Sequence, residues 1–106
     1  MNIGSLYQVK KRFWLLFPTK EIVAAATARA IAPIYVALAA RIARSDDAAW
    51  YAARFSRLYN CNVTWFSPDS FVVCLEEDGR LKKFLTSEGL IGWTWVDDNS
   101  FEEVKP

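Results

Sequence analysis

Residues 61–96 of the chain decide its fold, and they read CNVTWFSPDSFVVCLEEDGRLKKFLTSEGLIGWTWV. Apolar and polar side chains alternate along most of this stretch, which is the two-residue period of a β-strand. The alternation is interrupted by three turn sequences, Ser67-Pro68-Asp69, Glu77-Asp78-Gly79 and Ser87-Glu88-Gly89. We therefore predict an antiparallel meander of four strands joined by three tight turns.

The turn sequences also predict the register of the strands. Each fits a three-residue hairpin loop, whose last residue is left-handed and is best Gly, or less well Asp. Such loops give the pairs Phe66–Ser70, Glu76–Arg80 and Thr86–Leu90. A two-residue turn at Asp78-Gly79 is the competing choice, but it would mix polar and apolar side chains on both faces of the sheet.

This register sorts the meander into two faces. The first is almost wholly apolar and is expected to be the core; it holds Cys61, Val63, Trp65, Phe71, Val73, Leu75, Leu81, Lys83, Leu85, Ile91, Trp93 and Trp95. Only Lys83 is out of character there, and its aliphatic stem can snorkel. The second face is mixed and is expected to be largely solvated; it holds Asn62, Thr64, Phe66, Val72, Cys74, Glu76, Arg80, Lys82, Phe84, Gly92, Thr94 and Val96.

The N-terminal half predicts one long strand followed by helices. Residues 6–17 alternate in the manner of a strand, Pro18 ends it, and Thr19 can cap the following helix. An apolar stripe at helical spacing follows at Ile31, Ile34, Leu38 and Ile42. Pro33 is expected either to kink this helix or to split it. A further helix is expected to begin near Ser45-Asp46-Asp47, because these are good capping residues.

Together these elements predict a single α+β domain over residues 1–106, in the order β-α-α-β-β-β-β. The long N-terminal strand and the four-strand meander form an antiparallel sheet, with two or three helices packed on its tryptophan-bearing face. The sequence leaves open whether the first strand pairs beside residues 61–66 or beside residues 90–96. A short edge strand is expected over residues 101–104.

Charge is distributed unevenly along a chain whose net charge is only +1. Residues 1–60 carry nine basic and three acidic side chains, whereas residues 61–106 carry four basic and nine acidic ones. The simplest interpretation is that the two halves attract each other within one fold or across a dimer, and the alternative is a basic face used for binding.

Composition argues against several classes of function. The chain has no histidine and only two cysteines, so catalytic triads and structural zinc sites are not expected. No phosphate-binding or dinucleotide fingerprint occurs, and we expect neither an enzyme nor a cofactor. No secretory signal is visible, and the apolar stretch Ile22–Ala43 is interrupted by Arg29, Pro33 and Arg41. A cytoplasmic protein without a membrane span is therefore expected.

The leading functional hypothesis is a small non-catalytic protein-interaction or regulatory module that acts as a homodimer. It rests on a row across the second face, Thr64–Val72–Phe84–Gly92, with Phe66 beside it. The alternative role of Phe84 is to shield Gly92, where a side chain is missing. Trp50 lies off the apolar stripe of its helix and would be exposed unless a partner covered it. The partner-binding candidates are thus Phe66, Val72, Phe84 and Trp50.

Two other hypotheses stay open. The first is single-stranded nucleic-acid binding through sheet aromatics and basic residues, namely Lys10, Lys11, Arg12, Arg54 and Arg57. The second is a small-ligand pocket between the helices and the sheet, lined by Trp65, Trp93 or Trp95.

Overall fold

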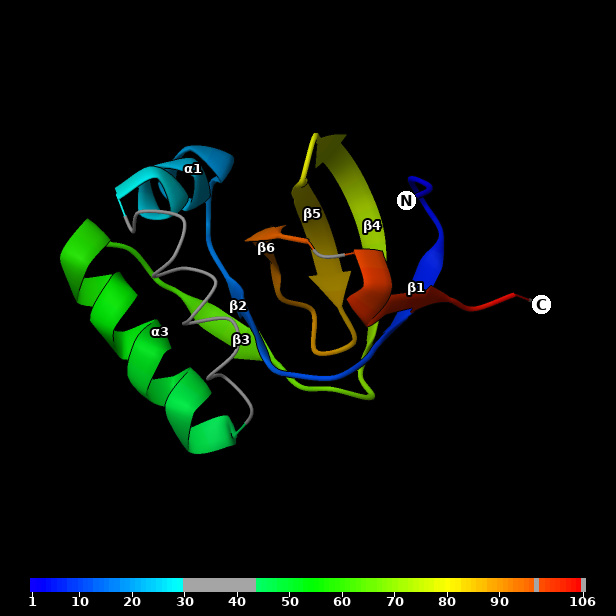
Figure 1. Ribbon diagram of the computed structural model, residues 1–106, viewed down its shortest axis with the longest axis horizontal. Coiled ribbons are helices and arrows are strands. Elements are labelled where there is room, and N and C mark those ends of the chain that lie inside the picture. Colours follow the sequence, from blue (N-terminus) through cyan, green and yellow to red (C-terminus); the bar gives the residue numbers. More distant parts are fainter. Residues whose placement is uncertain (30–43, 97, 106) are drawn as a thin grey trace.

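The computed structural model describes residues 1–29, 44–96 and 98–105. The apolar stripe from Ile31 to Ile42 and the expected effect of Pro33 lie outside the described residues. Figure 1 shows the elements in order: β1 (Leu6–Val9), β2 (Trp14–Leu16), α1 (Lys20–Arg29), α3 (Ser45–Tyr59), β3 (Thr64–Phe66), β4 (Phe71–Asp78), β5 (Leu81–Thr86), β6 (Ile91–Trp95), a 3-10 turn (Asp98–Ser100) and β7 (Phe101–Glu103).

The strands form a five-stranded antiparallel sheet in the order β6-β5-β4-β1-β7 and a two-stranded sheet of β2 and β3. The predicted α+β class is confirmed, and the short edge strand near the C-terminus is present as β7. In Figure 1, β2 and β3 lie between the helices and the larger sheet. Phe17 and Trp93 exchange two backbone hydrogen bonds, of 2.8 and 2.6 Å, which join β2 to β6. The two sheets therefore make a partly closed barrel.

The first strand is not continuous, because the chain bends between β1 and β2. Lys11 has a φ of 73°, a left-handed conformation that ends an extended strand. β1 pairs with β4 and β7, whereas β2 pairs with β3. Of the two positions that the sequence left open, β2 takes both, since it pairs with β3 and is bridged to β6.

The third predicted turn is confirmed. Gly89 has a φ of 84°, the N–H of Thr86 donates to the carbonyl of Leu90 at 2.8 Å, and Phe84 lies opposite Gly92. The glycine permits the left-handed position that closes a three-residue loop.

The first two predicted pairings are wrong. Phe66 pairs with Trp14 rather than Ser70, because the Ser67–Asp69 loop carries the chain from one sheet to the other. In the next hairpin Asp78 pairs with Leu81, and an irregularity between Cys74 and Glu76 shifts the register. Lys83, not Arg80, is therefore the basic partner of Glu76, at 3.4 Å.

The second face of the sheet, which was expected to be solvated, forms the barrel interior, whereas the first face is only partly covered. Cys74 and Phe84 have no exposed surface, whereas Ile91, assigned to the core by pattern, is 56% exposed. The reason is barrel closure, because side chains from β2, β3 and β7 cover the second face. The interior consists of Tyr7, Val9, Trp14, Leu16, Phe66, Val72, Cys74, Phe84, Val96 and Phe101.

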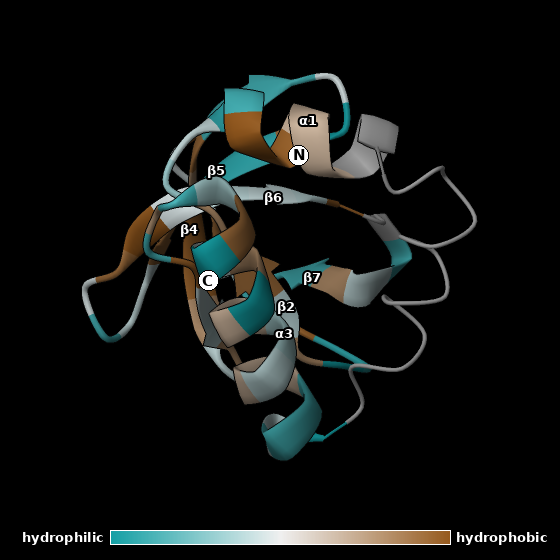
Figure 2. Ribbon diagram, turned by 90° about the vertical axis from the view of Figure 1, so that its left-hand side faces the viewer, coloured by the Kyte–Doolittle hydropathy of each residue, from teal (hydrophilic) through white to brown (hydrophobic). Residues whose placement is uncertain are grey.

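A second apolar cluster lies outside the barrel, beneath α1 and α3. Phe17, Val23 and Trp93 are buried in it, so the helices cover a tryptophan-bearing side of the strands as expected. Figure 2 looks from this side and shows both helices in front of the strands. None of the helices within the described ranges has the length and apolar character needed to span a membrane.

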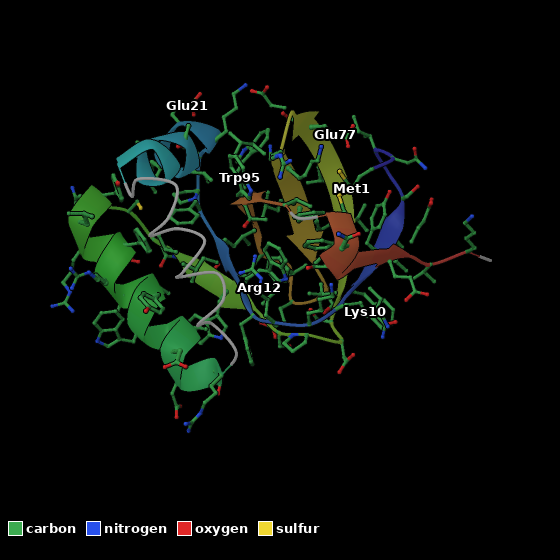
Figure 3. All side chains as sticks on the ribbon, in the orientation of Figure 1. Met1, Lys10, Arg12, Glu21, Glu77 and Trp95 are labelled. Carbon is green, nitrogen blue, oxygen red and sulfur yellow. The ribbon has the colours of Figure 1, made fainter. Side chains whose placement is uncertain are left out.

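Ion pairs join the basic and acidic halves of the chain. Lys10 Nζ lies 3.4 Å from Glu102 Oε2, and Lys20 Nζ lies 3.3 Å from Asp78 Oδ2. The amino group of Met1 lies 3.0 Å from Glu77, and Figure 3 labels both residues. Hydrogen bonds from this amino group and then from Lys82 lower the pKa of Glu77. The interpretation that the two halves attract each other within one fold agrees with these contacts.

The burial of Cys74 in the barrel predicts unequal reactivity of the two free thiols. Cys74 is fully buried and Cys61 is half-buried. Burial raises the pKa of the Cys74 thiol, and the Glu77 carboxylate adds to this effect. Because thiolates are the reactive species and Cys74 must first be uncovered, we expect iodoacetamide to modify it at least about tenfold more slowly than Cys61. Peptide mass spectrometry measures both rates.

The control for this experiment is the same reaction in urea, where both thiols should react alike. Equal rates in the native protein would contradict the barrel interior and return Cys74 to a solvated face.

Candidate functional site

Three of the four predicted partner-binding residues lie inside the barrel. Phe66, Val72 and Phe84 are all buried, so the expected row across the second face is not a surface. Phe84 does lie opposite Gly92, but the atoms nearest to the missing side chain of Gly92 belong to Leu16 and Phe17. Trp50 is on α3 and is 55% exposed, as the helical pattern indicates.

The predicted basic residues belong to two separate elements. Lys10, Lys11 and Arg12 are in the connection between β1 and β2, where Figure 3 labels Lys10 and Arg12. The Arg12 guanidinium lies 3.6 Å from the ring centre of the buried Trp14. Arg54 and Arg57 are exposed on α3. At least Lys10 and Arg12 therefore have structural contacts that compete with binding a phosphate.

A pocket lies at the mouth of the barrel. It has a volume of about 330 Å³ and is lined by Thr64, Trp65, Phe66, Ser67, Ser70, Thr86, Ser87, Glu88 and Leu90. These residues come from β3, the loop that follows it, and the β5–β6 hairpin. We call this the mouth pocket.

The residues that line the mouth pocket include one exposed tryptophan, several hydroxyl-bearing residues and one carboxylate. Trp65 is 38% exposed, whereas Phe66 and Thr86 are buried. Two hydroxyls already have structural partners, since Ser70 Oγ donates to the Ser67 carbonyl at 2.6 Å and Thr86 Oγ1 accepts from the Leu90 N–H at 3.1 Å. Glu88 is the only charged residue among the lining residues. The pocket is thus electronegative.

All three residues of β3 line the pocket, and among the strands of the described ranges β3 pairs with β2 alone, which leaves its other edge open. Phe17 directs its N–H and C=O toward Trp93, so the alternation of an antiparallel ladder directs those of Leu16 and Trp14 toward β3. Their partners are Thr64 and Phe66. Between them, Trp65 directs its own N–H and C=O away from β2 and toward the open edge.

A second feature is an apolar row on the outer, solvent side of the larger sheet. Leu6 is opposite Val73, Val73 is opposite Leu85, and Leu85 is opposite Ile91. The N–H of Val104 donates to the carbonyl of Leu6 at 2.9 Å and extends the row beyond β1. We call Val104, Leu6, Val73, Leu85 and Ile91 the outer row. Leu6, Ile91 and Val104 are exposed, and the other two are half-buried.

Sequence reasoning missed both features for identifiable reasons. Leu85 and Ile91 were assigned to the core because their alternation marks an apolar face without saying which face becomes covered. Glu88 was read only as a turn residue, and Trp65 was assigned to a pocket beneath the helices. Within the described part of the chain, no group of three side chains suited to binding a metal lies together.

No protein-family model, curated protein or solved structure matches this chain.

Proposed function

We propose that this protein is a non-catalytic interaction module that pairs with a second copy of itself through the outer row. The observation that carries the proposal is the register of the row, in which apolar side chains lie directly opposite one another from β1 to β6. Directly opposed side chains on adjacent strands form a continuous surface.

The outer row is the kind of surface that a partner covers. Monomeric proteins rarely expose contiguous apolar patches beyond a few hundred Å². Phe71 enlarges the patch, because it lies on the same side of β4 as Val73 and is 41% exposed. Burial of these side chains provides the free energy of association.

The charges around the outer row favour a second copy of the chain as the partner. Lys83 is paired with Glu76 on one side of the row, and Lys10 is paired with Glu102 on the other. The flanks are therefore nearly neutral, and the net charge of +1 gives little repulsion between copies. A two-fold axis would place the row of one copy on that of the other, as an isologous interface requires.

Replacing Ile91 by glutamate should dissociate the dimer. Ile91→Glu would bury an unpaired carboxylate in each copy, so we expect the dissociation constant to rise at least about thirtyfold. Sedimentation velocity measures it, and the wild type should approach twice the single-chain mass of 12.1 kDa. Thermal unfolding of the diluted proteins shows whether the variant still folds.

Leu58→Glu is the matched control, because Leu58 is 60% exposed on α3, and Figure 1 shows α3 separated from β1, β4 and β5 by β2 and β3. It should leave the dimer intact. A wild type that stays at the single-chain mass at all concentrations, or a control that dissociates as readily as Ile91→Glu, would overturn the proposal.

We further propose that the protein acts in the cytoplasm. Both cysteines are free thiols, and free thiols persist in a reducing compartment. Fractionation of the native cells should recover the protein with the cytoplasmic fraction, and recovery from an oxidising compartment would contradict this.

A further inference from the structure

We propose that the mouth pocket is a second binding site, independent of the outer row, that takes an extended peptide segment carrying a lysine or arginine side chain. The ligand adds to the open edge of β3 through its backbone and places its cationic side chain in the pocket. Three features of the pocket support this, namely its backbone edge, its tryptophan and its charge.

The backbone edge offers one donor and one acceptor to an extended chain. The N–H and C=O of Trp65 point away from β2, and an antiparallel peptide residue opposite Trp65 would exchange two hydrogen bonds with them. Addition of a strand to an open sheet edge is a recurrent mode of peptide recognition, in which the backbone gives affinity and side-chain pockets give specificity. Here all three residues of β3 line the pocket.

The contacts of the other tryptophans indicate that the ligand side chain at Trp65 is cationic. Four of the five indoles have a cation of the chain itself over the ring: Arg12 over Trp14, Lys20 over Trp93, Arg54 over Trp50 and Arg80 over Trp95, at 3.6 to 5.8 Å. Among the residues that the structure describes, Trp65 is the one tryptophan without such a contact. Trp65 is 38% exposed and is one of the residues that line the pocket, so an external cation can approach it there.

The charge of the pocket selects the same class of side chain. Glu88 supplies a carboxylate to pair with an ammonium or guanidinium, and the lining includes no lysine or arginine. Hydroxyl oxygens of Ser67 and Ser87 can accept further N–H bonds. The same charge disfavours phosphate groups and acidic side chains, so a nucleic acid is not the occupant that this pocket fits.

The probe for the test is the peptide acetyl-Thr-Val-Lys-Val-Thr-amide, followed by nuclear magnetic resonance of the ¹⁵N-labelled protein. We expect saturable shifts at the Trp65 backbone amide and indole. The same peptide with leucine in place of lysine should bind at least about fivefold more weakly, and one with glutamate should not bind. Raising the salt concentration should weaken the lysine peptide more than the leucine peptide.

Variants of the pocket complete the test. Trp65→Leu and Glu88→Gln should each weaken the lysine peptide at least about fivefold. The matched controls Trp50→Leu and Glu102→Gln change an exposed indole and an exposed carboxylate elsewhere, and they should leave binding unchanged. Thermal unfolding verifies that each variant folds.

Three results would overturn the proposal: no shift at Trp65 at millimolar peptide, equal binding of the lysine and leucine peptides, or full binding by Trp65→Leu. Displacement of the lysine peptide by a single-stranded oligothymidine would also overturn it. Repeating the titration with Ile91→Glu separates this site from the dimer, because loss of the outer row should leave the mouth pocket intact.

Discussion

Replacement of Phe84 by alanine should lower the free energy of unfolding by about 3–5 kcal/mol. The ring of Phe84 has no exposed surface. It stacks on Phe101 with 5.2 Å between ring centres and meets Phe66 edge-on at 6.2 Å. Truncation would leave a cavity between elements that hold the barrel closed. Urea unfolding, followed by tryptophan fluorescence, measures the loss.

Lys83→Ala is the control, because Lys83 precedes Phe84 and points to the opposite side of β5. It should cost no more than about 1 kcal/mol, since its ion pair with Glu76 is exposed. If Phe84→Ala cost as little as the control, the assignment of this face to the interior would be wrong.

Gly92→Ala should also be strongly destabilising, by about 3 kcal/mol. A Cβ added to Gly92 would lie 2.6 Å from the carbonyl oxygen of Phe17 and 2.7 Å from Leu16 Cγ. The same Phe17 carbonyl accepts the N–H of Trp93, so the added methyl group would force β6 away from β2. Urea unfolding gives the cost, and hydrogen exchange at the Phe17 and Trp93 amides should accelerate.

The control for Gly92→Ala is Gly89→Ala, which separates the clash from backbone strain. Gly89 has a φ of 84° and nothing within 4 Å of an added Cβ, so its replacement should cost only about 1–2 kcal/mol. Unchanged protection of Phe17 and Trp93 in the Gly92 variant would show that β2 and β6 are not joined as described.

Turn residues and hydrophobic periodicity predicted those parts of the fold that depend on residues close together in the sequence. The β5–β6 hairpin followed from one glycine in the third loop position, and the α+β class followed from the change of hydrophobic period after Asn60. The break at Lys11 left no comparable signal, because residues 6–17 alternate almost without interruption.

The buried face could not be predicted from the meander alone. Both sides of β4 carry apolar residues, with Val72 and Cys74 on one side and Phe71 and Val73 on the other. The choice between them depends on Trp14 and Phe101, which lie far away in the sequence and pack together at 4.9 Å in the barrel. Pattern analysis therefore found the two faces but not the burial of the second one, while part of the first is covered by the helices as expected.

The candidate sites, too, depend on contacts between residues that lie far apart in the sequence. Trp65 was recognised as a possible ligand contact, but its neighbour in the fold, Glu88, belongs to a hairpin loop 23 positions further along the sequence. The open edge of β3 depends on β2 and β6 lying side by side, which is a long-range contact. The outer row could not be predicted, because Val73, Leu85 and Ile91 were expected to be core residues and lie on the outer side of the sheet.

Pairing through the outer row is tested most directly by an isotope-filtered NOE measurement on an equal mixture of ¹³C-labelled and unlabelled protein. We predict contacts between copies at the methyl groups of Leu6, Val73, Leu85 and Ile91, and none at Val72. Contacts confined to α3 around Trp50 and Leu58, or no contact between copies at about 1 mM protein, would contradict it.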